Sequence, residues 1–437
     1  MKIIIAGAGS VGFNLAKTLC IGHDVTVIDQ NEEALHRIQE SLDILPVHGN
    51  VEDSQTYEPF KHLEIDLFIA VTNIDNVNLI ATMIAESSLS ISKTIVRLQK
   101  YFKDVFVIKE KMGVDDVIFP VRSATKGITS LLNYPKVNNI KLFRYTKNKL
   151  ISILALHSAN VKDFLSDESV VIGIERDKEF FIPDEDETIL MNDLVYFFGS
   201  HKEIEKICDI LEGTQTQSIE KCVVYGGDAL GVSIAKALLE TGRDVKLIEK
   251  DLQRCVSVDQ ELEGKASVIN AKYGSHELFE EENLDQADMF IATSKNDEFN
   301  IIKCLEAKEK GIQKIIAINN DMEYYNLMHS LGIVATRGPK ISAYHQIMEK
   351  IDSRGVIIQK WFCGSKAVVL LRKITSVSNF VNKKIKPITQ KGSSTFYIRE
   401  EIIYPFNEKI VLLEEDIIII FTKVKEMPRV KQWIYGL

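Results

Sequence analysis

Short apolar runs alternate with helical stretches along the first part of the chain. The runs have the length of strands, which are expected at residues 2–6, 25–28, 44–47, 67–71, 94–97 and 116–119. Helices are expected from Val11 and from Glu32, where Asn31 is placed to cap the second helix. Continuous apolar strands separated by helices are typical of a parallel sheet with both faces covered. Residues 1–135 are therefore predicted to form a doubly wound α/β domain.

The pattern becomes strand-rich after residue 138. Apolar runs that predict strands follow one another without long helical stretches, at residues 141–145, 150–156, 170–174, 180–182 and 194–198. One closing helix is expected over residues 201–211, and the polar segment TQTQS at 214–218 is expected to be a linker. Residues 136–214 are therefore predicted to form a small α+β domain.

Both patterns return in the second half, so the sequence is a tandem duplication. The segment IIIAGAGSVG at 3–12 resembles CVVYGGDALG at 222–231, and DLFIAVTNIDNVN at 66–78 resembles DMFIATSKNDEFN at 288–300. Such landmarks keep an offset of 219 to 223 residues, which is the signature of a repeated architecture. The prediction is two α/β domains, at 1–135 and 219–350, each followed by a small α+β domain, at 136–214 and 351–437.

The turn after the first strand carries the candidate chemistry. It holds a G-x-G-x-x-G motif made of Gly7, Ala8, Gly9, Ser10, Val11 and Gly12. In such a turn the first glycine permits a tight bend, the second lets a pyrophosphate approach the backbone, and the third packs the helix on the strand. Asp29 ends the second strand, where it can accept both ribose hydroxyls and repel a 2′-phosphate. The motif predicts a site for NAD(H), ATP or ADP; the alternative is a glycine turn kept for packing alone.

Later strands end in further polar residues, at the edge where open α/β sheets bind ligands. The candidates are Asn50, Thr72, Asn73 and Arg97. Asn50 is a candidate to line the adenine or ribose. Arg97 is a candidate partner for a phosphate or for a carboxylate across an interface; the alternative is a surface arginine without a fixed partner. Asp75 and Asn78 are expected to cap the next helix.

The second half departs from this pattern. Its motif reads Gly226, Gly227, Asp228, Ala229, Leu230 and Gly231, and Glu249 keeps the ribose-binding acid. Asp228 stands where a diphosphate approaches most closely, and two unit charges about 4 Å apart repel by about 4 kcal/mol at an effective dielectric near 20. The counterpart of Arg97 is expected at Ala317, so the cation is missing as well. The hypothesis is one competent nucleotide site per chain, with the second site degenerate or altered.

Composition and missing motifs narrow the class of protein. A net charge of −9 without a long Lys/Arg run argues against a dedicated nucleic-acid binder. Six scattered cysteines without a C-x-x-C pair indicate reduced thiols and no zinc site. No run approaches the roughly 18 apolar residues of a membrane span, and the N-terminus has no signal-peptide layout. We expect a soluble, intracellular protein without a catalytic set or a metal, because the acids at 184–187 suit a solvated loop and no Ser/His/Asp or Cys/His set is apparent.

These features together resemble the TrkA family, the regulatory subunits of Trk-type potassium uptake, which are built from RCK (regulator of K⁺ conductance) domains. The resemblance rests on KIIIAGAGSVG at 2–12, VID ending at Asp29, AVTNIDNVN at 70–78, IVR at 95–97, and the tandem order. It implies a cytoplasmic, peripheral protein that forms a homo-oligomeric ring, as a tetramer or a dimer, under a membrane potassium-translocating subunit. Nucleotide occupancy would gate that subunit, with residues 7–12, 29, 72–73 and 97 as contacts.

Two other functions stay open at this point. One is an RCK-type regulator of a different ion transporter, because the motifs do not name the ion. The other is an NAD-dependent oxidoreductase of unusual architecture, although the small domains of about 70 residues are short for a substrate domain. Identifying the membrane partner distinguishes a regulator of another ion transporter from a regulator of potassium uptake. A substrate-dependent change in nicotinamide absorbance reveals an oxidoreductase.

Overall fold

The computed structural model describes residues 1–102, 104–213, 218–271, 278–321, 324–352, 357–376, 378, 380–388 and 392–436. Four of the five residues of the expected linker at 214–218 lie outside these ranges. The chain folds into two compact units. The first consists of Met1–Lys126, Asp228–Ser233 and Arg337–Ile351, and the second of Gly127–Gly227, Ile234–Thr336 and Asp352–Leu437.

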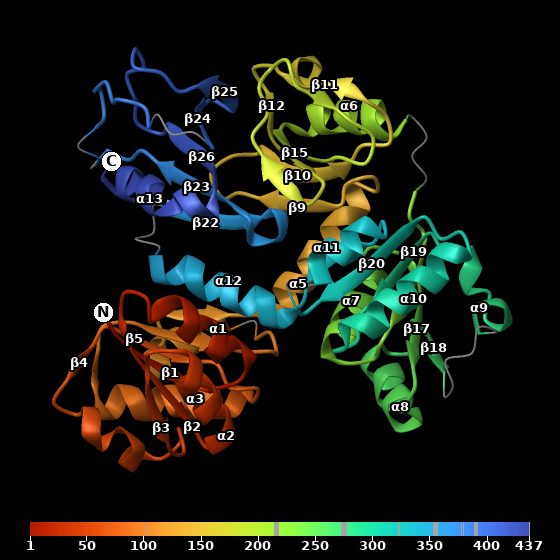
Figure 1. The fold of residues 1–437 in the computed structure, drawn as a ribbon. Helices are drawn as coiled ribbons and strands as arrows, with labels where there is room; N and C mark the ends of the chain where they lie inside the picture. The colour runs from red at the N-terminus through yellow and green to blue at the C-terminus, as the bar shows by residue number, and fades with distance from the viewer. Residues whose placement is uncertain are drawn as a thin grey trace. The chain divides into compact units, whose positions relative to one another are not determined.

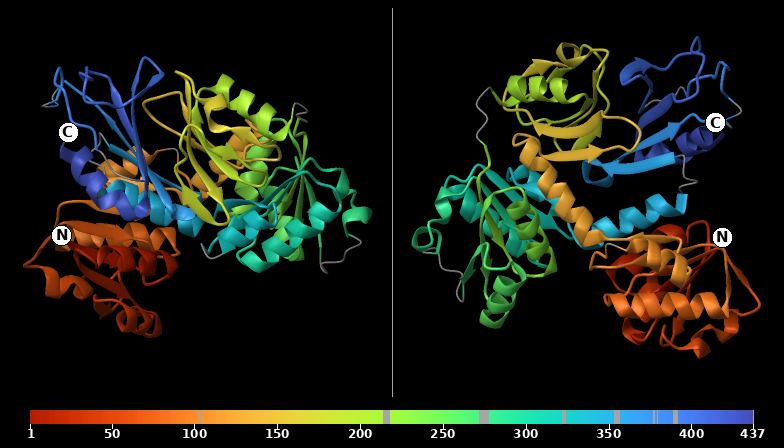
Figure 2. Two further views of the ribbon diagram at one scale, coloured as in Figure 1. Left: turned by 45° about the horizontal axis from the view of Figure 1, so that its top comes forward. Right: turned by 180° about the vertical axis from the view of Figure 1, so that it is seen from behind.

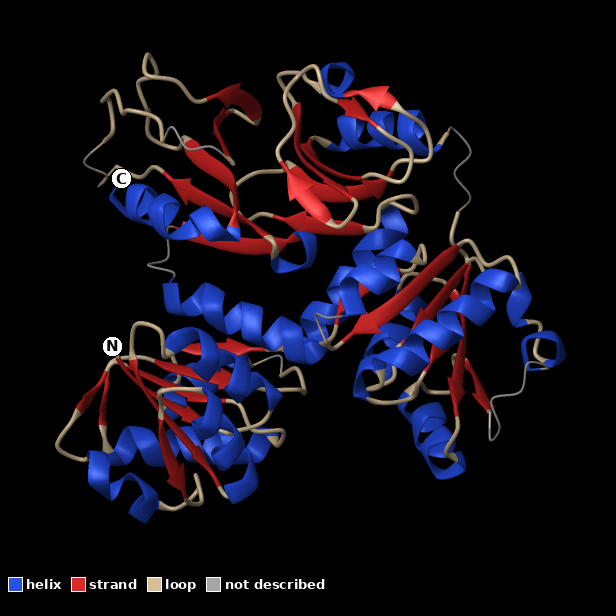
Figure 3. Cartoon of the chain, in the orientation of Figure 1, coloured by secondary structure: helices blue, strands red, loops and turns tan. Residues whose placement is uncertain are grey.

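The first unit is built on a six-stranded sheet in the order β3-β2-β1-β5-β7-β8 (Figures 1 and 3). Its strands pair in parallel and are β1 (Lys2–Ala6), β2 (Asp24–Asp29), β3 (Leu45–His48), β5 (Leu67–Ala70), β7 (Thr94–Arg97) and β8 (Asp116–Ile118). The helical segments between them are α1 (Ser10–Leu19), α2 (Glu32–Ser41), η1 (Ser54–Phe60), α3 (Asp75–Ser88) and α4 (Val105–Met112), with α5 (Pro120–Thr129) after the last strand. A short pair, β4 (Glu64–Ile65) and β6 (Ser90–Ile91), lies apart from this sheet. The predicted parallel α/β sheet is confirmed.

Both faces of this sheet are buried, which explains its continuous apolar strands. Ile3 and Ile5 of β1 belong to the core under α1 and α2, whereas Ile4 and Ala6 belong to the core under α3 and η1. Alternate residues of a strand point to opposite faces, so a strand covered on both sides has no solvent-facing position for a polar side chain. The predicted cap of α2 is also confirmed, because the Asn31 side chain accepts a hydrogen bond of 3.0 Å from the backbone N–H of Ala34.

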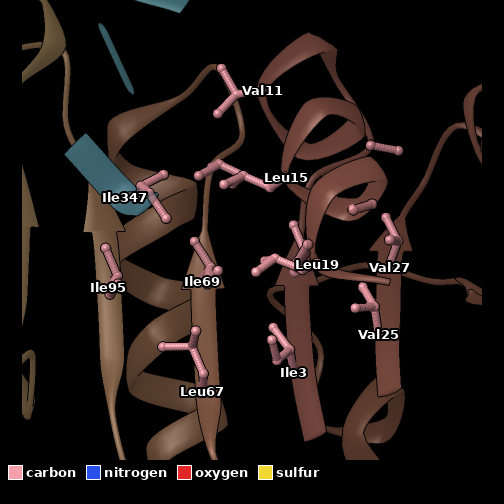
Figure 4. Packing of buried hydrophobic residues seen from close by; sticks show 14 of the residues in the cluster. Ile3, Val11, Leu15, Leu19, Val25, Val27, Leu67, Ile69, Ile95 and Ile347 are labelled. Carbon is pink, nitrogen blue, oxygen red and sulfur yellow. The ribbon is translucent and has the colours of Figure 1, made fainter. Parts of the chain in front are cut away.

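A helix from the second half completes the first unit. Helix α12 (Pro339–Asp352) places Ile347 in the same core as Ile69 and Ile95, as Figure 4 shows. On α1, Thr18 Oγ1 is 2.9 Å from the hydroxyl of Tyr344 on α12. The predicted range 219–350 contains α12, yet the apolar face of this helix packs on the first sheet.

The first small domain lies in the second unit and has an antiparallel sheet in the order β13-β12-β15-β10-β9. Its strands are β9 (Asn139–Leu142), β10 (Lys149–Leu154), β12 (Ser169–Arg176), β13 (Glu179–Phe181) and β15 (Leu194–Gly199). Beside them lie the short pair β11 (Ala159–Asn160) and β14 (Thr188–Ile189), the turn η3 (Val161–Phe164) and the closing helix α6 (His201–Glu212). The strand expected at 141–145 therefore begins and ends earlier than predicted, while the closing helix is confirmed.

The second α/β sheet repeats the topology of the first, in the order β18-β17-β16-β19-β20-β21. Its strands lie in the green and teal part of the ribbon in Figure 2. Its strands are β16 (Lys221–Tyr225), β17 (Asp244–Glu249), β18 (Ser267–Asn270), β19 (Met289–Ala292), β20 (Lys314–Asn319) and β21 (Val334–Arg337). Its helices are α7 (Ala229–Glu240), α8 (Leu252–Glu261), α9 (Leu278–Glu281), α10 (Asp297–Glu309) and α11 (Tyr325–Ser330). The matching strand orders confirm the predicted duplication.

The last small domain has a five-stranded antiparallel sheet in the order β22-β23-β26-β24-β25. Its strands and helix are β22 (Ile357–Phe362), β23 (Ala367–Lys373), β24 (Ser393–Arg399), β25 (Ile402–Pro405), β26 (Ile417–Lys423) and α13 (Met427–Gly436). The two small sheets share one apolar core, to which Phe198 of β15, Phe362 of β22 and Phe421 of β26 contribute. None of the helices in the described ranges has the length and apolar character needed to cross a membrane.

A buried ion pair joins the two small domains. Lys366, which precedes β23, forms an ion pair with Glu175 of β12, whose side chain is 2% exposed. The other carboxylate oxygen of Glu175 accepts hydrogen bonds of 3.2 Å from the Tyr196 hydroxyl and the Cys363 thiol. Because Glu175 and Tyr196 belong to the first small domain and Cys363 and Lys366 to the turn between β22 and β23, this cluster links the two small domains.

Candidate nucleotide site

The glycine turn between β1 and α1 has two positions that packing alone reserves for glycine. Gly7 has a φ of +117°, and a Cβ there would lie 3.0 Å from the backbone nitrogen of Thr72. A Cβ on Gly12 would lie 1.9 Å from the carbonyl oxygen of Gly7. These two glycines let β1 and α1 approach closely, which agrees with the predicted roles of the first and third glycine.

Gly9 is different, because nothing in the fold requires glycine there. Its φ of −68° and ψ of −177° are open to any residue, and a Cβ at this position would meet no atom of the described part of the chain within 4 Å. Gly9 is the N-cap of α1 and offers no side chain to cap the first-turn N–H groups, whose dipole favours an anion. The space above Gly9 favours a ligand over the alternative of a turn kept for packing alone.

Asp29 holds the glycine turn from the end of β2. Its carboxylate accepts hydrogen bonds from the backbone N–H groups of Ala8, at 2.6 Å, and Asn31, at 2.8 Å. Asp29 is half-buried, so part of the residue remains accessible to solvent. This is the position at which an acidic residue accepts ribose hydroxyls in dinucleotide-binding turns.

Asp75 and Asn78 do not cap α3, which corrects the expectation from sequence. The N-cap of α3 is Ile74, and it makes no side-chain cap hydrogen bond. Asp75 instead accepts hydrogen bonds from the backbone N–H groups of Gln99, at 2.8 Å, and Lys100, at 2.9 Å. These bonds tie the start of α3 to the loop after β7.

Asn78 is buried and ties together two strand ends that carry candidate ligand contacts. Its Oδ1 accepts a hydrogen bond of 2.8 Å from the N–H of Thr72, and its Nδ2 donates to the carbonyl oxygens of Thr72, at 3.0 Å, and Arg97, at 2.9 Å. The structure therefore brings Thr72, Asn73 and Arg97 together at the carboxyl edge of the sheet.

Arg97 is a buried cation with weak hydrogen bonds, so it is not the free surface arginine of the alternative interpretation. The residue is 5% exposed, and its Nη1 lies 3.4 Å from both the Val71 carbonyl and Asn73 Oδ1. Its Nε is buried and has no hydrogen-bond partner among the residues that the structure describes. Burial lowers the pKa of Arg97, against the opposing effect of the Asp75 carboxylate. A guanidinium has five N–H donors, so this one retains capacity for an anion.

The candidate role of Asn50 remains a prediction. Its side chain is exposed, and Oδ1 accepts a hydrogen bond of 2.9 Å from the N–H of Glu52, which folds the loop after β3 on itself. The Asn50 carbonyl accepts a hydrogen bond of 2.8 Å from the Thr56 hydroxyl.

The second glycine turn keeps an acidic residue, Glu249, at the end of its second strand, but the side chain of Asp228 in the turn itself occupies the anion site. The N–H of Gly227 donates to Glu249 at 2.8 Å, as that of Ala8 does to Asp29. Asp228 Oδ1 accepts hydrogen bonds of 3.1 Å from the N–H groups of Leu230 and Gly231, in the first turn of α7. These are the N–H groups that bind phosphate in an open turn, so the Asp228 carboxylate occupies their bonding capacity.

The counterpart of Arg97 is Ile318, and the assignment to Ala317 was wrong by one residue. Asn78 donates to the carbonyl of Arg97, and Asn300 donates in the same way to the carbonyl of Ile318, both at 2.9 Å. A fixed offset cannot follow the small length differences between the two halves. Ile318 is apolar, as Ala317 is, so the second half still lacks a cation at the position of Arg97.

Sequence reasoning missed one residue of the second turn. Arg254 on α8 donates from Nε to the Gly227 carbonyl at 2.7 Å and pairs with Glu261 at 2.8 Å. Its position in the repeat corresponds to Ala34, since the N–H groups of both residues donate to the cap of their helix. The sequence did contain a signal for this residue, because Arg254 is a large cation at the position where the first half has the small residue Ala34. Among the described residues, no group of three or more acidic, histidine or cysteine side chains gathers to hold a metal.

The fold and its two turns define a class of tandem α/β proteins with dinucleotide-binding topology. The family model described as the TrkA-N domain matches residues 3–120 and again 222–337, and the TrkA-C domain model matches residues 158–212. The two TrkA-N matches cover more than half of the chain. The chain therefore belongs to the TrkA family of RCK regulatory proteins, which confirms the resemblance.

Relatives match along the whole chain. The Trk system potassium uptake protein TrkA homolog 1 of Methanosarcina mazei is 27% identical over 453 residues, with 99% of this chain and 100% of the relative covered. The Trk system potassium uptake protein TrkA of Vibrio alginolyticus is 27% identical over 441 residues, with 96% and 95% covered. Both relatives are named for potassium uptake.

Solved structures share the fold over the full chain. The crystal structure of the GsuK RCK domain matches with a TM-score of 0.63 at 14% identity, covering 100% of this chain and 95% of that chain. The GsuK channel bound to NAD matches with a TM-score of 0.61 at 12% identity, covering 100% and 79%. At these identities the likeness shows the RCK fold.

Proposed function

We propose that this chain is the cytoplasmic, nucleotide-binding subunit that gates a membrane potassium-uptake transporter of the Trk type, and that it acts as a regulator and not as an enzyme. The observation that carries the proposal is the contrast between the two glycine turns. The first is open above Gly9, with uncapped N–H groups, and the second is capped by Asp228. One working site and one internally closed site suit a chain that senses a nucleotide.

The bound molecule is NAD(H), with ATP or ADP as ligands of the same site. Its pyrophosphate lies on the N-terminus of α1 above Gly9, and Asp29 accepts the hydroxyls of the adenosine ribose. The guanidinium of Arg97 faces the far phosphate or the second ribose from the carboxyl end of β7. Its buried, under-bonded state supports this role, because an anion would supply the partner that its Nε lacks.

Gating requires that the nucleotide bind one conformation better than another, since a ligand with equal affinity for both shifts nothing. The chain assembles into a homo-oligomeric ring and docks on an integral-membrane potassium-translocating subunit. The contact of α12 with α1 supports coupling, because a helix from the second half rests on the helix that binds phosphate. A structural change at the first site on nucleotide binding is thereby transmitted to the second half of the chain through α12.

Binding stoichiometry tests the contrast between the turns. Titration of the purified chain with NADH and with ADP in a calorimeter is expected to give one nucleotide per chain. The variant Asp228→Gly frees the N–H groups of Leu230 and Gly231 and is the matched test of the closed turn. Two nucleotides per wild-type chain at comparable affinity would overturn the single-site proposal.

Replacing Asp29 is expected to weaken nucleotide binding and to relax its selectivity. Asp29→Ala removes the charged acceptor of the ribose, so affinity for NADH falls by on the order of tenfold to a hundredfold, the worth of one or two hydrogen bonds to a charged group. NADPH, whose 2′-phosphate the carboxylate repels, loses less. Asp29→Asn is the comparison variant, because its one amide oxygen can still accept from the Ala8 N–H while the charge and the second acceptor oxygen are lost. Equal NADH affinity in all three proteins would show that the site lies elsewhere.

A further inference from the structure

The second unit contains a cavity of about 350 Å³ that the nucleotide site does not use. It lies where the segment before β9 and the end of α6 meet the start of β20 and the segment before β21. Small-molecule sites typically occupy about 300–1,000 Å³ and combine apolar walls with a few converging polar groups. This cavity has that composition, with Leu154, Leu156, Ile315 and Val334 among its apolar residues.

A buried lysine forms one side of the cavity. Lys314, the first residue of β20, is 9% exposed, and its Nζ donates a hydrogen bond of 2.8 Å to the Val137 carbonyl. An ammonium has three N–H donors, so capacity remains for an acceptor in the cavity. Burial lowers the pKa of Lys314, which is the response of a cation that lacks full compensation.

An acid forms another side. Glu212 is the last residue of α6, where the negative end of the helix dipole disfavours a carboxylate. Among the described residues, no basic group lies within 4.0 Å of its carboxylate, although Lys136 and Lys314 are near enough to lower its pKa against the larger effect of burial. Lys136 is already engaged with Asp209, at 2.9 Å, and with the Gly213 carbonyl.

The Lys314 ammonium and the Glu212 carboxylate thus line the same cavity without forming an ion pair with each other. A buried charge without a close partner is costly, and a ligand that supplies the partner offsets this cost. A simple anion would satisfy Lys314 and face Glu212, and a simple cation would do the reverse. A molecule with both charges satisfies both groups and leaves the net charge of the cavity unchanged.

We propose that this cavity binds a small zwitterion of the amino-acid class, with its carboxylate on Lys314, its ammonium on Glu212 and an apolar side chain against Leu154 and Leu156. Such a ligand joins α6 of the first small domain to β20 of the second α/β domain. It is a second input to the chain, separate from the nucleotide and independent of the identity of the transported ion.

Thermal unfolding of the full chain with each standard amino acid at millimolar concentration is the first test. At least one with an apolar side chain is expected to raise the unfolding temperature, with NADH absent and with NADH present. Calorimetry then compares that amino acid with its N-acetyl derivative, which lacks the cation, and its amide, which lacks the anion. Both are expected to bind more weakly by on the order of tenfold, the worth of one charge-assisted hydrogen bond.

Two variants locate the site. Glu212→Gln removes the charge with little change of shape, so the amino acid and its N-acetyl derivative are expected to bind it alike. Glu205→Gln, an exposed acid on the same helix, is the matched control and is expected to keep the wild-type preference. The proposal is overturned if no amino acid shifts unfolding, or if Glu212→Gln keeps the wild-type preference. Neither result bears on nucleotide binding, which is measured separately.

Discussion

Gly9→Asp is expected to weaken nucleotide binding at the first site on the order of 10³-fold while leaving the unfolding temperature unchanged or slightly raised. A carboxylate about 4 Å from a pyrophosphate costs about 4 kcal/mol at an effective dielectric near 20. The fold tolerates the change, because a Cβ on Gly9 meets no atom within 4 Å and the backbone there is not in the left-handed region. Asp228 shows that the repeated turn accepts an aspartate and uses it as a helix cap.

Calorimetric titration with NADH and ADP measures this loss, and circular dichroism melting measures stability. Gly22→Asp is the matched control, since a Cβ on this exposed glycine also meets no atom within 4 Å and the residue lies after α1, away from the turn. Wild-type affinity in Gly9→Asp would mean that the pyrophosphate does not approach this turn. A large loss in Gly22→Asp would mean that the effect is one of net charge.

Glu175→Ala is expected to lower the stability of the second unit by about 1–3 kcal/mol, because it removes a buried acceptor and leaves buried donors without it. Lys366 would lose the carboxylate, and the Tyr196 hydroxyl and the Cys363 thiol would lose their acceptor. The two small sheets share one core around this cluster, so their unfolding is expected to begin at lower urea concentration.

Urea denaturation followed by tryptophan fluorescence measures this change, because Trp361 is buried in β22 of the last small domain. Glu179→Ala is the control, as an exposed glutamate on the neighbouring strand β13, and is expected to change stability by less than about 0.5 kcal/mol. Equal midpoints for Glu175→Ala and Glu179→Ala would show that the buried pair contributes nothing to the junction of the small domains.

The strands and the duplication could be predicted because both follow from local pattern. Strands buried on both faces read as continuous apolar runs, and β1 and β7 match the predicted residues 2–6 and 94–97. The cap at Asn31 also follows from its neighbours in the chain, since the acceptor and donor are three residues apart. The glycine turn is a local feature of the same kind.

The parts that could not be predicted depend on partners far along the chain. Asp75 has the residue type and position of a helix cap, and only the fold shows that the loop after β7 supplies its donors, 24 and 25 residues away. The placement of α12 on the first sheet has no local signal, because its apolar face fits either α/β domain by pattern alone. The burial of Arg97 likewise depends on residues from β5 and its loop.

The central claim is that nucleotide binding at the first turn controls potassium uptake. Rubidium tracer uptake at low external potassium tests it most directly, in cells that lack this chain and carry either no copy, wild type, Gly9→Asp or Gly22→Asp. Uptake is expected to be lost without the chain, restored by wild type and Gly22→Asp, and not restored by Gly9→Asp at equal protein level. Equal uptake in all four strains would contradict the potassium role, and full rescue by Gly9→Asp would contradict nucleotide control of it.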